Sequence, residues 1–297
     1  MKVAIDFDNT FFTPNRDVDD GLALLYLLGS GQVELLSVTS SFGNKGIAVV
    51  EADTLKLLEV CGLSRELYAR GGSEPGAYLS PASRQLADLA ERWAGELCVL
   101  ATGSLTNLHG AYLYNPNFFK QVKQIVLMGG LTQPLVFAKD TMQELNFSCD
   151  PMASFSVLSR TPNLAIMTGN HCLDLLFHEA EYRELFTRED SPIVDLIREY
   201  SAPWFVDNEV EYGIEGFYNW DTLAAAYLLH PKYYEDVWAE YTVSVEGLAT
   251  GRLDCPPVDQ TSYRTSKPYA RRSLNTPRVA KKAALRKHLY DTWQQID

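Results

Sequence analysis

Residues 3–20 read VAIDFDNTFFTPNRDVDD, and they place five aspartates between two apolar segments. The first segment, Val3 to Ile5, is typical of a buried strand, and the second, Leu22 to Leu28, of a buried helix. In α/β proteins, ligands bind in the loops that follow the carboxyl ends of strands. Five like charges so close together repel one another unless a cation or bound protons compensate them. The stretch therefore predicts an α/β fold with a ligand site, and it favours a hard metal ion in that site.

The composition is that of a globular, acidic protein. Hydrophobic residues make up 46% of the 297 residues and charged residues 22%, so the chain can bury a full core. A formal net charge of −12 makes nucleic acid and anionic membranes unsuitable partners. No apolar run approaches ~18 residues, and the N-terminal segment is a core strand rather than a signal peptide. The five cysteines include no CxxC pair, which is typical of reduced thiols. We therefore expect a soluble cytoplasmic protein.

Apolar segments alternate with segments of helical periodicity along the first 170 residues. Strands are expected at 33–40, 66–69, 97–101, 124–128 and 164–167, with helices at 47–61, 81–94 and from 105 onward. Such alternation predicts a mostly parallel sheet flanked by helices. Farther along, the chain is expected to be helical and aromatic at 171–240, with a helix at 222–229, a strand at 241–245, a loop at 250–275 and a final helix from 276–277. No repeat or linker interrupts residues 1–297, which favours a single α/β domain.

The motif Asp6-x-Asp8-x-Thr10 after an apolar strand resembles the opening of the haloacid-dehalogenase phosphatases. That resemblance implies a magnesium-dependent phosphatase with Asp6 as the phosphoryl nucleophile. The same family also needs a lysine and a further acidic pair after its later strands. No strand end after residue 100 supplies them.

A second resemblance covers more of the chain. Asp6-x-Asp8 followed by Asp19-Asp20 and an apolar helix is similar to the opening of the nucleoside hydrolases of the inosine/uridine-preferring type. Further matches follow in the order of that family: Phe42-Gly43-Asn44, Thr102 to Asn107, Leu127 to Gly130, Glu144 to Asn146, Asp150-Pro151 and Trp220 to Tyr227. Each match is weak alone, but the ordered set is specific. The chain is therefore identified as a member of this family.

The resemblance implies a Rossmann-like α/β domain that hydrolyses the N-glycosidic bond of ribonucleosides with Ca²⁺ as cofactor. The implied calcium ligands are the carboxylates of Asp8, Asp20 and Asp221 and the backbone carbonyl of Leu127. Asp8 would also act as the general base on water, with Asp6 as its support. Ribose contacts are implied for Asp19, Asn44, Glu144 and Asn146. The chemistry agrees, because an oxocarbenium-like sugar needs nearby carboxylates and an activated water. Members of the family are commonly homodimers or homotetramers.

Simpler interpretations exist for several of these residues. Asp19, Asp20 and Asp221 each precede an apolar helix and also suit a helix N-cap. Glu144 and Asn146 also suit an ordinary polar loop. A nucleoside-binding protein that has lost catalysis is an alternative function, against which the intact set of carboxylates argues.

The chain departs from the family pattern at four places, which limits how many of the family's residue roles can be assigned to it. The loop between Asp8 and Asp19 is longer than the usual tight turn, and its residues 11–17 are either a surface loop or a lid that affects specificity. Ala138 stands where the family often has an Asn for the ribose 5′-hydroxyl, so the preferred sugar and its 5′ substituent stay open. His171 is either structural or an acid at the rim of the pocket.

The fourth departure concerns the nucleobase. Many members have a His just before the late aspartate, where it is proposed to protonate the leaving base, but this chain has Trp220. The purine-preferring branch resembles this, with a Trp that stacks on the base. Tyr78 is a candidate for a second stacking wall. These residues favour purine substrates, while a packed core aromatic is the simpler interpretation of Trp220.

Overall fold

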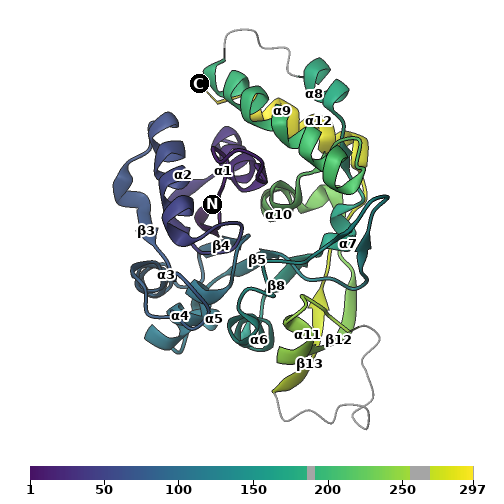
Figure 1. Cartoon of the computed structure of the whole chain (residues 1–297). Coiled ribbons are helices and arrows are strands. Elements are labelled where there is room, and N and C mark those ends of the chain that lie inside the picture. The colour runs from purple at the N-terminus through teal and green to yellow at the C-terminus, as the bar shows by residue number, and fades with distance from the viewer. Residues whose placement is uncertain (186–190, 255–267, 297) are drawn as a thin grey trace.

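The computed structural model describes residues 1–185, 191–254 and 268–296. Helices cover both faces of a central eight-stranded sheet (Figure 1). Its strands, in spatial order, are β12 (Trp238–Ser244), β13 (Tyr269–Asn275), β8 (Leu164–Met167), β5 (Gln124–Met128), β4 (Leu97–Ala101), β1 (Lys2–Phe7), β2 (Glu34–Ser40) and β3 (Tyr68–Arg70). Neighbouring strands are parallel except β12 with β13. The expected α/β fold with a mostly parallel sheet is confirmed.

All but one of the described α-helices lie in two layers, one on each face of the sheet. One layer contains α1 (Asp19–Gly29), α2 (Ile47–Val60), α8 (Glu179–Leu185), α9 (Pro192–Tyr212), α10 (Trp220–Leu229) and α12 (Lys282–Trp293). The other contains α3 (Pro81–Arg92), α4 (Thr106–Tyr114), α5 (Phe118–Gln121), α6 (Pro151–Arg160) and α11 (Val245–Leu248), and the short α7 (Gly169–Cys172) lies at one end of the sheet (Figure 1). Three small two-stranded sheets pair β6 (Leu135–Val136) with β7 (Thr141–Met142), β9 (Leu176–Phe177) with β10 (Phe217–Tyr218), and β11 (Tyr234–Glu235) with β14 (Arg278–Val279).

Strand β1 shows how the sequence creates these layers. Val3, Ile5 and Phe7 point into the core on one face of the sheet, and Ala4 points into the core on the other. A strand that is buried on both faces needs an apolar run rather than alternation. Helix α1 is likewise buried along almost its whole length, and it packs against α10. The N-termini of α1 and α10 thus meet at the carboxyl edge of the sheet.

The C-terminal part of the chain differs from the expectation. Residues 269–275, within the expected loop, form strand β13, which pairs with β12 along its length and with β8 at Asn275 and Ala165. Its sequence YARRSLN is mostly polar because only Leu274 and Asn275 are buried. The final helix begins at Lys282 rather than after Pro277, because residues 278–279 pair with β11 instead. None of the described helices is long and apolar enough to cross a membrane.

Candidate active site

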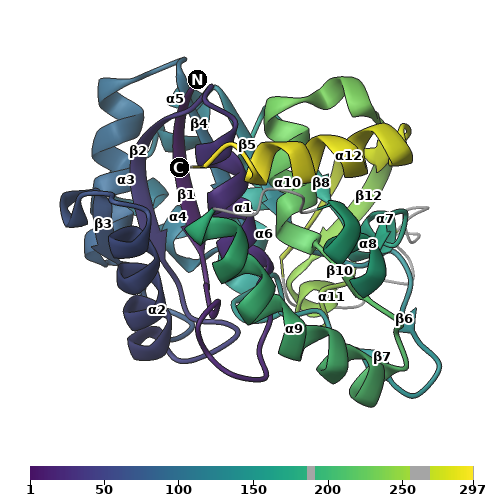
Figure 2. The same cartoon turned by 90° about the horizontal axis from the view of Figure 1, so that it is seen from above.

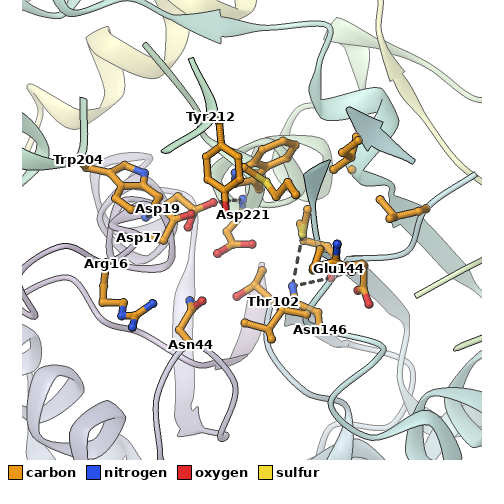
Figure 3. Close-up of a pocket in the computed structure, with 18 of the residues that line it drawn as sticks. Arg16, Asp17, Asp19, Asn44, Thr102, Glu144, Asn146, Trp204, Tyr212 and Asp221 are labelled. Atoms are coloured by element: carbon orange, nitrogen blue, oxygen red, sulfur yellow. Dashed lines mark hydrogen bonds between the residues drawn. The ribbon is translucent and has the colours of Figure 1, made fainter. Parts of the chain in front are cut away.

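A cavity of ≈ 240 Å³ opens at the carboxyl edge of the sheet. Thr102, which follows β4, and Met128, which ends β5, line it from the sheet. Asp19 at the start of α1 and Asp221 in the first turn of α10 line it from the helices (Figure 3). Negative side chains suit the N-terminus of a helix, where the helix dipole is positive. The expected ligand site is therefore built from strand ends and helix starts that are far apart in the sequence.

Three buried aspartates form the floor of the site. One carboxylate oxygen from each of Asp19, Asp20 and Asp221 lies within 4.8 Å of the others. The backbone N–H of Asp221 donates to Asp19 (3.0 Å), and the Thr102 hydroxyl donates to Asp20 (2.8 Å). The start of α10 is therefore tied to the start of α1 by the hydrogen bond from the Asp221 N–H to the Asp19 carboxylate. None of these aspartates is an N-cap residue: they lie inside the first turns of their helices, and Val18 and Asn219 occupy the N-cap positions.

Asp8 lies directly beside this cluster. Its Oδ2 accepts a hydrogen bond from the backbone N–H of Asn44 (2.5 Å), and the Asn44 amide contacts Asp20 (3.4 Å). Its Oδ1 is buried and has no hydrogen-bond partner within the described ranges. Asp8 packs so tightly that a Cβ at Gly43 would lie 1.9 Å from its carboxylate oxygen. The aspartate is thus fixed by backbone, with one oxygen left for another partner.

Asp6 plays a supporting part below Asp8. Its carboxylate accepts hydrogen bonds from the Thr39 hydroxyl (2.6 Å) and from the Asn107 amide (2.8 Å). Asn107 also donates to the carbonyl of Ser40 (2.9 Å) and accepts from the N–H of Gly72 (2.9 Å). Asp6 does not line the cavity, and neither do Asp8 and Asp20, which lie just beneath the lining residues Asp19 and Asp221. Through Thr39 and Asn107, Asp6 links the ends of β1 and β2 to the start of α4 beneath the site.

The carboxylates of the site hold protons more tightly than ordinary aspartates. Burial raises the pKa of Asp8 to about 6 and that of Asp19 to about 7. Burial and the charge of Asp8 raise the pKa of Asp20 well above the ordinary range, and burial and the charge of Asp19 do the same for Asp221. A buried cation would relieve this repulsion. Oxygen-only donors, close spacing and the unpartnered Asp8 oxygen all fit a hard metal ion.

Glu144 and Asn146 lie across the cavity from the aspartates (Figure 3). The Glu144 carboxylate accepts from the backbone N–H groups of Gly130 (3.1 Å), Phe147 (2.7 Å) and Ser148 (2.9 Å). Asn146 donates to the carbonyl of Met128 (3.1 Å). Both residues are held in place by backbone groups and line the cavity, and their role as ribose contacts stays a prediction.

The comparisons with known proteins agree with this geometry. The family model of the inosine-uridine preferring nucleoside hydrolases matches residues 3–281. The chain belongs to this family. Uridine nucleosidase 1 of Arabidopsis thaliana is 24% identical over 264 residues, which cover 79% of this chain and 77% of the relative. The inosine-uridine preferring nucleoside hydrolase of Leishmania major is 25% identical over 251 residues, covering 72% and 76%.

Solved structures show the same fold. A purine-preferring ribonucleoside hydrolase from Gardnerella vaginalis superposes with a TM-score of 0.77 at 20% identity, covering 100% of this chain and 99% of that one. An inosine-uridine preferring nucleoside hydrolase from Bacillus anthracis also gives 0.77, at 17% identity and 99% coverage of both. Because the nucleoside hydrolase family model covers residues 3–281, the haloacid-dehalogenase alternative is wrong.

Within this nucleoside hydrolase, the aromatic wall differs from the expectation. Trp220 lines the cavity as expected and is 7% exposed, with its ring 5.0 Å from that of Tyr218. Tyr78 does not line the cavity. Its ring packs edge-on against His109 at 4.5 Å, and its hydroxyl reaches Asp150, so its loop is held against α4 and α6 instead.

Trp204 and Tyr212 of α9 complete the aromatic lining (Figure 3). The sequence shows these residues only as part of an aromatic segment, because nothing in their local pattern places α9 over the site. His171 does not line the cavity; its ring bonds the carbonyl of Pro277 (3.1 Å), which supports the structural interpretation. Leu127 lies in β5 just before Met128, and its role as a metal ligand stays a prediction.

Proposed function

We propose that this nucleoside hydrolase carries out calcium-dependent hydrolysis of the N-glycosidic bond of ribonucleosides, which yields ribose and a free nucleobase. One observation carries the proposal: Asp8, with one unpartnered oxygen, lies beside three clustered aspartates, of which Asp19 and Asp221 line a cavity whose opposite side holds Glu144. A sugar that develops positive charge at its anomeric carbon needs carboxylates in such an arrangement.

Asp8 is the proposed general base. Its Oδ2 is held by Asn44, so its Oδ1 is available to take a proton from the attacking water. Burial raises its pKa to about 6, which is close to the value that suits a base working near neutral pH. Asn44 therefore orients the base and leaves its buried Oδ1 without a partner among the described residues.

The proposed ion is calcium, with Asp8, Asp20, Asp221 and the Leu127 carbonyl as its ligands. These donors are all oxygen, the type that calcium and magnesium take, whereas zinc sites commonly include nitrogen or sulfur. Calcium tolerates six to eight ligands in flexible geometry, which suits carboxylates from two helices and two strand ends. When bound, calcium would hold sugar hydroxyls and lower the pKa of the attacking water.

The ribose is proposed to lie between Asp19, Asn44, Glu144 and Asn146. Glu144 is half-buried and accepts three backbone hydrogen bonds, so its carboxylate keeps one orientation while it accepts from a sugar hydroxyl. Trp220 supports a preference for purines, because a fused double ring offers more area for stacking. Ala138 has no side-chain amide that could contact the ribose 5′-hydroxyl.

A substrate panel tests the proposal. Chelator-treated protein is assayed for reducing sugar with inosine, adenosine, uridine and cytidine, with and without added calcium. Release from at least one nucleoside, dependent on calcium, is expected. Saturable nucleoside binding without release from any of the four would instead indicate a binding protein.

Two further proposals concern the protein in the cell. A cytoplasmic location is supported by Cys61, Cys98, Cys149 and Cys172, which are free thiols in the described part of the chain; Cys255 lies outside it. A homodimer or homotetramer stays a prediction, and analytical ultracentrifugation measures it directly.

A further inference from the structure

The cavity contains one positively charged side chain that the proposed reaction has not used. Arg16 is the only Lys, Arg or His among the described residues that line the cavity, and its neighbours in the lining include Asp17, Asp19 and Glu211. Arg16 is exposed, and it makes no hydrogen bond or ion pair with any residue in the described ranges. A guanidinium beside an acidic cavity thus keeps all its donors for a ligand.

Arg16 belongs to a loop that is firmly anchored. Phe11 and Phe12 are buried, and their rings pack against Tyr200 of α9 at 5.6 Å and 4.9 Å. Asp53 of α2 accepts from the N–H of Phe12 (3.0 Å). Figure 2 shows this loop, which follows β1, between α2 and α9. Phe11 and Phe12 therefore anchor the extra segment, while Pro14, Asn15 and Arg16 are exposed at its tip.

The end of the loop directs Arg16 to the cavity. Thr10 donates through its hydroxyl to the carbonyl of Asp17 (2.9 Å), which closes the loop at its base. Asn15 adopts a left-handed conformation (φ 57°), which Asn tolerates better than most residues. The backbone reverses there, and Arg16 follows at the rim of the site.

The position of Arg16 relates it to the nucleobase, on the basis of the proposed function. Figure 3 shows Arg16 beside Asn44 on one side of the cavity, with Glu144 on the other side. Asn44 bonds Asp8, the proposed base for the water that attacks the anomeric carbon. The proposed function places the ribose against Glu144 and Asn146, which leaves the side of the cavity that Arg16 lines for the nucleobase.

A donor is needed on that side of the site. No histidine lines the cavity in the described part of the chain; its lining offers neutral donors such as the Tyr212 hydroxyl and the Trp204 indole N–H, and Arg16 is its one cation. The departing ring nitrogen gains an electron pair, which must be neutralised by a proton or a cation. An arginine is too weak an acid to transfer its proton, but it stays charged and donates hydrogen bonds in a planar fork.

We propose that Arg16 is a catalytic residue that binds the departing nucleobase as an anion. The bond between the anomeric carbon and the ring nitrogen breaks, and its electron pair stays on the base. The water oxygen bonds to the anomeric carbon, and one water proton passes to Asp8. The base leaves paired with Arg16 and then takes up one proton from solvent.

Leaving-group dependence tests this assignment. Arg16→Gln is compared with wild type on uridine, inosine and p-nitrophenyl β-D-ribofuranoside, whose leaving group departs without help. We expect kcat/KM for the two nucleosides to fall about 10- to 100-fold, since a hydrogen bond to a charged group is lost. The p-nitrophenyl substrate should change less than about threefold. Arg16→Lys keeps the charge without the fork and should fall between the two.

The matched control is Arg65→Gln, which removes an exposed arginine outside the cavity and should leave all rates unchanged. An equal loss on all three substrates would contradict the proposal, because it would show a structural or sugar-binding role. Unchanged nucleoside rates would also contradict it. Uridine and inosine 5′-monophosphates are assayed in parallel, and a loss confined to them would overturn the proposal in favour of a phosphate contact. Wild-type protein that hydrolyses none of the substrates would instead refute the proposed function.

Discussion

Asn107 connects the strand ends beneath the site through four hydrogen bonds. It donates to Asp6 and to the carbonyl of Ser40, and it accepts from Gly72 and from Ser80. Asn107→Ala leaves these buried groups without partners, so we expect the free energy of unfolding to fall by about 2–4 kcal/mol.

Urea denaturation of the Asn107 variant measures this loss. Asn117→Ala is the matched control, since Asn117 is exposed and its side chain makes no hydrogen bond in the described structure. An Asn107 variant as stable as this control would show that the network beneath Asp6 contributes little.

Individual site residues differ in how well the sequence predicts them. Asp19 and Asp20 are adjacent and start a buried helix, so their place could be read from a single segment. The failure at Tyr78 has a physical reason: its loop contacts His109 and Asp150, and both contacts join residues far apart in the chain. Arg16 could not be placed either, because its position depends on two phenylalanines packing against α9.

At the scale of elements, the turn between β2 and α2 fixes the geometry of Asp8. A Cβ at Gly43 would lie 1.9 Å from the Asp8 carboxylate, so Gly43→Ala must displace that side chain. A displacement of about 1 Å can cost about 100-fold in rate, and we expect a fall in kcat of that order.

Gly46→Ala is the control in the same turn. A Cβ at Gly46 would meet nothing within 4 Å, and its φ of −62° suits alanine. Steady-state kinetics of the two variants should therefore separate. Equal activities would mean that the turn does not position Asp8.

The elements that build the sheet could be predicted where they are apolar. Strands β1, β4 and β5 are buried on both faces and stand out as apolar runs. Strand β13 could not be predicted, because its polar residues face outward and its pairing partners, β8 and β12, come from earlier in the chain. Its register is set by the completed sheet rather than by its own sequence.

The charge of the whole site should couple stability to pH and to calcium. In the metal-free protein, burial raises the pKa of Asp8 to about 6 and of Asp19 to about 7, from an ordinary 3.8. The folded state then binds protons more tightly than the unfolded state, so stability falls as pH rises from about 4 through about 7. We expect a higher Tm at pH 5 than at pH 8 without metal.

Bound calcium should counteract the loss of stability at high pH. It replaces protons on the carboxylates, so added calcium should raise Tm more at pH 8, where fewer protons must be displaced. Differential scanning fluorimetry at both pH values measures the effect. A metal-free protein that is more stable at pH 8, or a calcium shift that is larger at pH 5, would contradict the model of a proton-binding site relieved by a cation.

The proposed hydrolysis mechanism depends on Asp8 as the base that activates water. The most direct test is Asp8→Asn, assayed for ribose release from the best nucleoside at saturating calcium, with circular dichroism as the check on folding. We predict a fold that stays intact and a kcat lower by about 10²- to 10⁴-fold, the usual contribution of a positioned general base. A folded variant that keeps about a tenth or more of the wild-type kcat would contradict the role of Asp8 as the general base.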